Sequence, residues 1–178
     1  MTTTTTATTT VDSLLSQCTY ECTPAFCLSG TTTLCRVLDV YDGDTVTLAV
    51  PMHGTVYSFA SRMEGIDTCE MKSKTPFCVD RAFRARNRLA QLCSGSTDAE
   101  LPLDNRWPRA QLRKFLQGKA CIVTALCGEF DKYGRLLSRL SVQAEDFATV
   151  LLREKLAYRY DGATKPTESE IEALLTIN

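Results

Sequence analysis

Two strand-like runs joined by Asp42 and Gly43 constrain the fold more than any other feature of this sequence. Residues 35–40 favour a strand, and in residues 45–50 valine and leucine alternate with threonine and alanine. An alternation with a period of two is typical of a strand that buries one face. An aspartate followed by glycine is a pair preferred in type I′ turns. We therefore predict a β-hairpin with Asp42 and Gly43 at its turn.

The order of the later periodic segments extends this hairpin into a small barrel. They are a strand at 55–66, a helix at 79–93, strands at 121–127 and 136–142, a helix at 145–157 and a last helix opened by a capping box at 167–170. This order predicts an α+β fold, a five-stranded OB-fold Greek-key barrel with about three packed helices. Periodicity alone does not separate this barrel from other small α+β folds.

The chain of 178 residues has room for one domain, which we expect from residue 34 to residue 178. Residues 1–33 are predicted to be a disordered Thr-rich tail and a Cys-rich extension. The first ten residues have neither the basic nor the apolar region of a signal or transit peptide. No run of about 18 apolar residues occurs, which excludes a transmembrane helix. We expect a soluble, intracellular monomer that binds no membrane.

Nine cysteines are present, and an odd number without a secretory signal suggests reduced thiols inside a cell. Cys18, Cys22, Cys27 and Cys35 form the densest group. Their spacing does not match the paired C-x2-C ligands of structural zinc sites, and His53, the only histidine, lies far along the chain. Small buried hydrophobes or free thiols are the preferred interpretation.

Acidic side chains from two strands are predicted to meet at one end of the barrel. Asp44 begins the second strand, and Asp67 and Glu70 come just after the third. Each of them alone is better explained as a turn or capping residue. Together they offer the hard oxygen ligands that Ca²⁺ prefers. The chain has 20 Lys and Arg against 21 Asp and Glu, so a polyanion must be met by local charge or by a bound cation.

Two arginines suggest what such a site would act on. Arg62 lies in the third strand-like run, and Arg135 ends the turn at residues 131–135. An arginine in an apolar strand is unfavourable unless it is paired, and its planar fork suits two phosphate oxygens. A divalent ion, carboxylates and two arginines describe a site that cleaves phosphodiester bonds.

Three blocks of this sequence resemble the staphylococcal nuclease (thermonuclease) family. They are Asp42-Gly43-Asp44-Thr45, then Arg62 with Ile66-Asp67-Thr68-Cys69-Glu70, then Asp131-Lys132-Tyr133-Gly134-Arg135. Their order and approximate spacing also agree with the family. The resemblance covers roughly residues 34–178.

The resemblance implies a Ca²⁺-dependent nuclease that hydrolyses DNA and RNA with little base specificity, prefers single-stranded or frayed substrates and leaves 3′-phosphate ends. It implies roles for eight residues: calcium ligation by the carboxylates of Asp44 and Asp67 and the main-chain carbonyl of Thr68, catalysis by Arg62, Glu70 and Arg135, and substrate binding by Lys132 and Tyr133. Glu70 is the family's proposed general base, and the two arginines would hold the scissile phosphate.

The chain departs from the family in several places. Cys69 stands where the family usually has proline, which leaves the loop before Glu70 less stiff. Residues 94–116 resemble an insertion. Its basic set with one tryptophan either contacts nucleic acid or forms a solvated helix with a packed Trp107. A nucleotide-stacking role for Tyr158 or Tyr160 stays open.

Two alternatives to a nuclease remain. The first is a catalytically silent module that keeps the barrel and binds nucleic acid or protein. Such a module would have no reason to keep the acidic residues and both arginines together. The second is a calcium-stabilised structural protein, which would leave Arg62 and Arg135 without a role.

Overall fold

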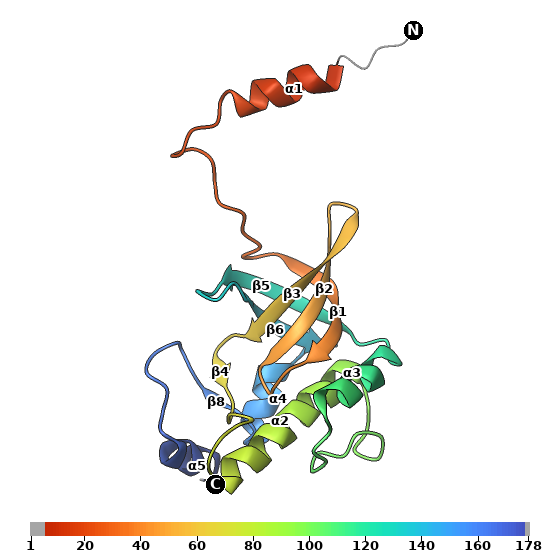
Figure 1. Ribbon diagram of the computed structural model, residues 1–178, viewed down its shortest axis with the longest axis vertical. Helices are drawn as coiled ribbons and strands as arrows, with labels where there is room; N and C mark the ends of the chain where they lie inside the picture. Colours follow the sequence, from red (N-terminus) through yellow and green to blue (C-terminus); the bar gives the residue numbers. More distant parts are fainter. Residues whose placement is uncertain (1–5, 177–178) are drawn as a thin grey trace.

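Five strands close into a barrel in the computed structural model (Figure 1). Strands β1 (Thr32–Val40), β2 (Thr45–Met52) and β3 (Thr55–Met63) form an antiparallel meander. Strand β5 (Ile122–Phe130) pairs antiparallel with β1 and with β6 (Leu136–Val142). A parallel pairing of β3 with β6 closes the ring. The predicted fold class, an α+β OB-fold barrel, is therefore confirmed.

The structure describes residues 6–176, and within that range it contains five helices. Helix α2 (Pro76–Ser94) and helix α4 (Phe147–Arg153) pack against each other and against the barrel strands. Helix α3 (Arg109–Gln117), which lies in the predicted insertion, packs against β1. Helix α5 (Glu168–Thr176) packs on α2, and α1 (Thr6–Leu15) stands away from the barrel (Figure 1).

Three two-residue strands lie outside the barrel ring. Strand β4 (Ile66–Asp67) pairs antiparallel with β8 (Tyr158–Arg159), so that Asp67 faces Tyr158 across the ladder. Strand β7 (Glu145–Asp146) pairs with the end of β6. The β4–β8 pair ties the segment after β3 to the C-terminal part of the chain.

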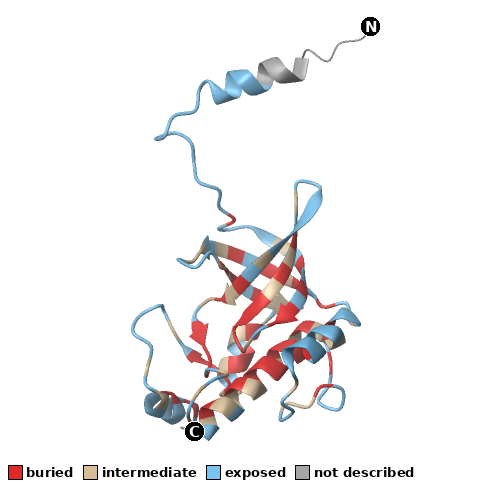
Figure 2. Cartoon of the chain, viewed as in Figure 1, coloured by how far each residue is buried: buried red, intermediate tan, exposed pale blue. Residues whose placement is uncertain are grey.

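The core fills the barrel and continues onto the inner faces of α2 and α4. Leu48 and Leu136 from the barrel, Leu89 from α2 and Phe147 from α4 are fully buried members of it. Figure 2 shows the buried residues gathered in the barrel and along α2, whereas α1 beyond residue 10 and the segment that follows it are exposed except at Leu28. A smaller buried cluster beside α5 includes Cys69 and Tyr158.

Two helices differ from their sequence predictions, and one agrees closely. Residues 6–15 form α1, in the segment for which the sequence predicted a disordered tail and a Cys-rich extension; residues 1–5 lie outside the described range. The helix predicted at 145–157 is shorter, because its first two residues form β7 and its last ones approach β8. The capping box before α5 is confirmed, since Thr167 N–H donates to Glu170 Oε2 at 2.8 Å.

The prediction of a type I′ turn is wrong, because this turn needs a positive φ at both central residues and neither Asp42 nor Gly43 has one. Glycine is required at position 43 for space. A Cβ there would lie 2.6 Å from Ala85 Cβ on α2 and 2.8 Å from Thr68 Cγ2. The hairpin turn therefore packs directly against α2 and against the loop that follows β4.

All nine cysteines are free thiols, and the six from Cys35 onward are buried. Burial raises the pKa of the Cys35 thiol to about 11, with neighbouring Cys127 adding to the shift. These thiols act as small apolar core residues, as the sequence predicted. Among residues 6–176 no helix is both long and apolar enough to span a bilayer.

Candidate functional site

Arg62 joins two carboxylates at one end of the barrel. Its Nη1 lies 2.9 Å from Asp44 Oδ2 and donates to Asp44 Oδ1 at 3.0 Å. Its Nη2 lies 3.1 Å from Asp67 Oδ1 and donates to the Ile66 carbonyl. The Arg62 side chain is 17% exposed, while those of Asp44 and Asp67 are 2% and 7% exposed. The structure thus brings together three of the predicted site residues as a desolvated Asp-Arg-Asp cluster.

The hairpin turn fixes Asp44 in this cluster. Asp44 N–H donates to Asp42 Oδ1 at 3.2 Å, which makes a local turn of the kind aspartate favours. Thr45 Oγ1 donates to Asp44 Oδ1 at 2.8 Å, and the Asp44 carbonyl accepts from Met63 N–H at 2.8 Å. Both the backbone and the side chain of Asp44 are therefore held from neighbouring strands.

Asp67 receives its position from the β4–β8 pair and from the loop after β4. Thr68 N–H donates to Asp67 Oδ1 at 2.9 Å, and the buried Tyr158 hydroxyl donates to Oδ2 at 3.0 Å. Burial raises the pKa of the Tyr158 phenol, and Asp67 adds to that shift, so the hydroxyl remains a proton donor. Tyr158 is 4% exposed and therefore has no face on which a nucleotide can stack.

Lys165 connects Asp67 with the exposed Glu70. Its Nζ lies 3.0 Å from Asp67 Oδ2 and 2.6 Å from Glu70 Oε1. Sequence reasoning missed Lys165, because it lies in a loop without a periodic pattern and outside the three sequence blocks. Cys69, between Thr68 and Glu70, is buried in the small cluster beside α5. That packing anchors the loop between Asp67 and Glu70.

Arg135 is placed near this end of the barrel but points to a different partner. It directly precedes β6, in which Leu137 pairs with Arg62. Its Nε and Nη2 both lie 2.7 Å from Asp131 Oδ2, and its guanidinium lies 5.5 Å from the centre of the Tyr133 ring. Lys132 Nζ lies 5.2 Å from the same ring, which is exposed. These three residues form an outward-facing group beside the Asp-Arg-Asp cluster.

An open cleft of about 720 Å³ lies beside Arg62. Leu137, Arg159 and Tyr160 contribute to its walls. The Arg62 guanidinium is 6.0 Å from the centre of the Tyr160 ring. Tyr160 is thus better placed than Tyr158 to contact a ligand in this cleft.

The two clustered carboxyl groups differ in acidity. Burial raises the pKa of Asp44, and the charges of Asp42 and Asp67 raise it further against the opposing effect of Arg62. Burial also opposes ionisation of Asp67, but hydrogen bonds from Asp44 and Lys165 lower its pKa overall. The single positive charge of Arg62 therefore only partly offsets the cost of ionising two nearly buried carboxyl groups.

The predicted calcium ligands suit a hard cation. Asp44 Oδ2 is buried and accepts no well-aligned hydrogen bond, despite its short ion pair with Arg62. An oxygen of this kind beside a second carboxylate matches the ligands that Ca²⁺ takes. Within the described residues no group of three or more His, Cys, Asp or Glu side chains is placed to hold a metal. The predicted set has only two carboxylates, completed by the Thr68 carbonyl.

Fold and site together define an α+β OB-fold barrel with an Asp-Arg-Asp cluster at one end. Models of known protein families give no match to this chain, and neither do curated proteins. Function must therefore be inferred from the site itself.

Proposed function

We propose that this protein is a Ca²⁺-dependent nuclease of the staphylococcal nuclease type. It would hydrolyse phosphodiester bonds of DNA and RNA with little base specificity, act best on single strands or frayed duplexes, and leave 3′-phosphate ends. The observation that carries the proposal is Arg62, held between Asp44 and Asp67 at the edge of an open cleft.

Asp44, Asp67 and the Thr68 carbonyl would hold the calcium ion. When bound, calcium would offset the negative charge of the phosphodiester and lower the pKa of a water ligand. The two carboxylates already lie within reach of one shared cation, the Arg62 guanidinium.

Arg62 would bind the scissile phosphate. It is desolvated and already pairs with anionic oxygens, and a guanidinium in such a setting stabilises charge that develops on phosphate oxygens. Arg135 would add a second guanidinium after leaving Asp131, and Lys132 and Tyr133 beside it would contact the substrate. Removal of one hydrogen-bond donor to a developing oxyanion typically lowers kcat by about 10²–10³.

Glu70 would act as the general base. Its carboxylate is exposed on the loop that follows Asp67 and carries Thr68, so a water molecule can reach it. Lys165 would hold Glu70 toward Asp67 until substrate binds. The free cysteines agree with a reducing, intracellular environment, which is part of this proposal.

A second candidate is a catalytically silent barrel that binds nucleic acid or protein. It is favoured by two contacts: Lys165 occupies both Asp67 and Glu70, and Arg135 pairs with Asp131. A calcium-stabilised structural protein is disfavoured, because the cleft beside Arg62 would then have no ligand.

Cleavage of single-stranded DNA tests the proposal. Purified protein should degrade it with Ca²⁺ and leave it intact with excess chelator. Arg62→Lys and Arg135→Gly should each lower the rate at least about 100-fold. Arg139→Gly, at an exposed β6 position, is the matched control and should keep full activity. Intact DNA after long incubation with calcium would favour the silent module, and cleavage in chelator would contradict the metal assignment.

A further inference from the structure

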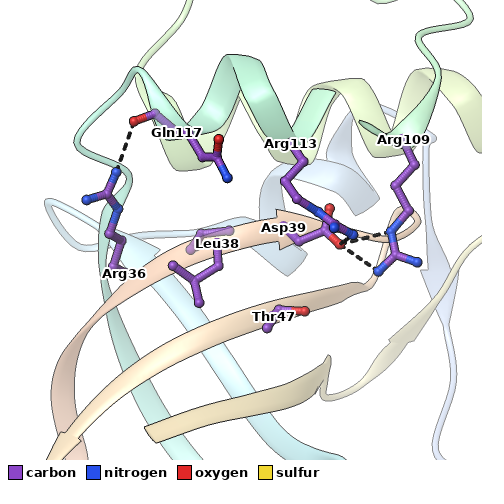
Figure 3. Close-up of a pocket in the computed structure, with 8 residues that line it drawn as sticks. Arg36, Leu38, Asp39, Thr47, Arg109, Arg113 and Gln117 are labelled. Atoms are coloured by element: carbon purple, nitrogen blue, oxygen red, sulfur yellow. Dashed lines mark hydrogen bonds and ion pairs between the residues drawn. The ribbon is translucent and has the colours of Figure 1, made fainter. Parts of the chain in front are cut away.

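A basic groove lies between helix α3 and strands β1 and β2, away from the Asp-Arg-Asp cluster. It has a volume of about 590 Å³. Arg109 and Arg113 enter it from α3, and Arg36 and Asp39 enter it from β1 (Figure 3). Helix α3 begins within the predicted insertion at residues 94–116, and the groove lies between this helix and the barrel wall.

Asp39 fixes both α3 arginines. Its Oδ2 accepts from Arg109 Nε at 2.9 Å and Nη2 at 2.5 Å, and from Arg113 Nη2 at 2.8 Å. Asp39 is 3% exposed, whereas the Arg109 and Arg113 side chains are 42% and 47% exposed. Asp39 Oδ1 is buried and has no hydrogen-bond partner among residues 6–176. The carboxylate thus keeps accepting capacity after it has oriented two exposed guanidinium groups.

The groove has an excess of positive charge and of hydrogen-bond donors. Three guanidinium groups, those of Arg36, Arg109 and Arg113, line the groove together with one carboxylate, Asp39, which pairs with Arg109 and Arg113. A guanidinium has five N–H donors. Arg109 uses its Nε and an Nη2 donor on Asp39, Arg113 uses an Nη2 donor, and Arg36 gives Nη2 donors to the Gln117 and Lys119 carbonyls. The remaining donors of these held, exposed groups are available to an anionic ligand.

The groove also leads toward the candidate catalytic end of the barrel. The Arg109 guanidinium lies 4.5 Å from the centre of the Tyr41 ring, and Tyr41 is 50% exposed. Tyr41 begins the turn that carries Asp44. At about 3.3 Å per residue, β1 places Arg36 roughly 13 Å from Val40 at the turn. Cationic groups therefore follow β1 from the hairpin turn to the far end of α3.

We propose that this groove binds the sugar-phosphate backbone of single-stranded nucleic acid, with Arg109 and Arg113 on its phosphates and Tyr41 as a stacking surface for a base. An open track of fixed guanidinium groups with an exposed aromatic ring is the arrangement that single-stranded chains bind without sequence preference. Trp107 takes no part, because it packs against Phe115 and the core. The inference rests on the proposed function in that the bound strand would continue toward Arg62.

The same arginines would serve only to hold α3 against β1 if the groove had no ligand. The two roles are separable by replacing charge while keeping hydrogen bonding. Arg109→Gln/Arg113→Gln retains amide donors for Asp39 but removes two positive charges. Arg153→Gln on α4, which is 63% exposed and pairs with Glu145, is the matched control.

Salt dependence of binding is the deciding measurement. Binding of a fluorescent single-stranded DNA oligonucleotide is followed in chelator, so that no cleavage occurs. Each phosphate contact contributes about 0.7 to the slope of log K against log salt for single strands, so the double variant should lose about 1.4 from that slope. Its affinity should fall at least about tenfold, and the Arg153→Gln control should match the original protein. An unchanged slope and affinity in a folded double variant would overturn the proposal.

Two further measurements keep this result independent of catalysis. Arg113→Gln alone leaves the Arg109–Asp39 pair intact and should lower the slope by about 0.7, so it serves if the double variant fails to fold. Calcium-dependent cleavage by the original protein is measured separately. If the original protein cleaves DNA but the variants bind it as tightly as the original does, the groove proposal is rejected and the nuclease proposal stands. If the original protein does not cleave DNA but the variants lose the predicted salt dependence, the groove is supported as a nucleic-acid binding site in its own right.

Discussion

Replacing Gly43 by alanine tests how the hairpin turn is held against α2. The new Cβ would lie 2.6 Å from Ala85 Cβ and 2.8 Å from Thr68 Cγ2. Neither neighbour is the end of a flexible side chain, because Ala85 is fixed to α2 and Thr68 is branched at Cβ. The turn must therefore move as a whole, and it carries Asp44 with it.

The magnitude follows from the cost of overpacking. Added methyl groups in a packed region destabilise by about 1–3 kcal/mol, and two contacts below 3.0 Å place Gly43→Ala at about 3 kcal/mol. Alanine also restricts the unfolded chain, which offsets about 0.4–1 kcal/mol. The net loss of about 2 kcal/mol corresponds to a Tm about 4–8 °C lower for a chain of this length.

Thermal unfolding with and without Ca²⁺ measures both consequences. Gly118→Ala is the control, because its Cβ would meet only Phe115 O at 3.4 Å, and its Tm should change little. Calcium should raise the Tm of the original protein and of the control. The rise should be smaller in Gly43→Ala, where Asp44 is displaced from Asp67. A Gly43→Ala protein with the same Tm as the original would contradict the steric clash. If the changes in Tm caused by Gly43→Ala and Ala85→Gly simply add in the double variant, the two Cβ atoms do not touch.

Three other perturbations follow from the site and the thiols. Arg62→Met should lower the free energy of unfolding by about 3–5 kcal/mol without metal, because two buried carboxyl groups lose their cation. Ca²⁺ should restore part of this loss in denaturant titrations. An equal calcium effect on the original protein and the variant would contradict this. Lys165→Met should strengthen calcium binding in a calorimetric titration, because a competing cation leaves Asp67; weaker binding would show that Lys165 helps to form the site instead. In native protein a thiol reagent should modify only the three exposed cysteines of the nine. Cys22 should react fastest, because hydrogen bonds from Thr19 lower its pKa. Rapid modification of six or more cysteines would contradict the burial of the other six thiols.

The barrel was predictable from sequence because its strands and helices differ in period and follow one another in a diagnostic order. Val46, Leu48 and Val50 alternate in the sequence and are all buried in the barrel. The capping box at Thr167 is a local interaction and was predicted for the same reason. Helix α1 was not predicted, because its first residues are almost all threonine and the segment from Val11 onward has no clean helical period.

The site was only partly predictable, because its geometry depends on long-range packing. Asp44, Arg62 and Asp67 were expected to meet, and they do. The contacts of Lys165 and Tyr158 with Asp67 depend on the β4–β8 pair and on the loop after it. No local sequence pattern encodes either of them. The requirement for glycine at position 43 arises from the approach of α2 and not from its own turn.

The ends left on cleaved DNA test the central claim most directly. A 5′-labelled and a 3′-labelled single strand are incubated with the protein and Ca²⁺, and the products are compared before and after treatment with a phosphatase. The proposed chemistry predicts calcium-dependent products with 3′-phosphate and 5′-hydroxyl ends. Products with 5′-phosphate ends would contradict the mechanism, and the absence of any product would contradict the assignment of this protein as a nuclease.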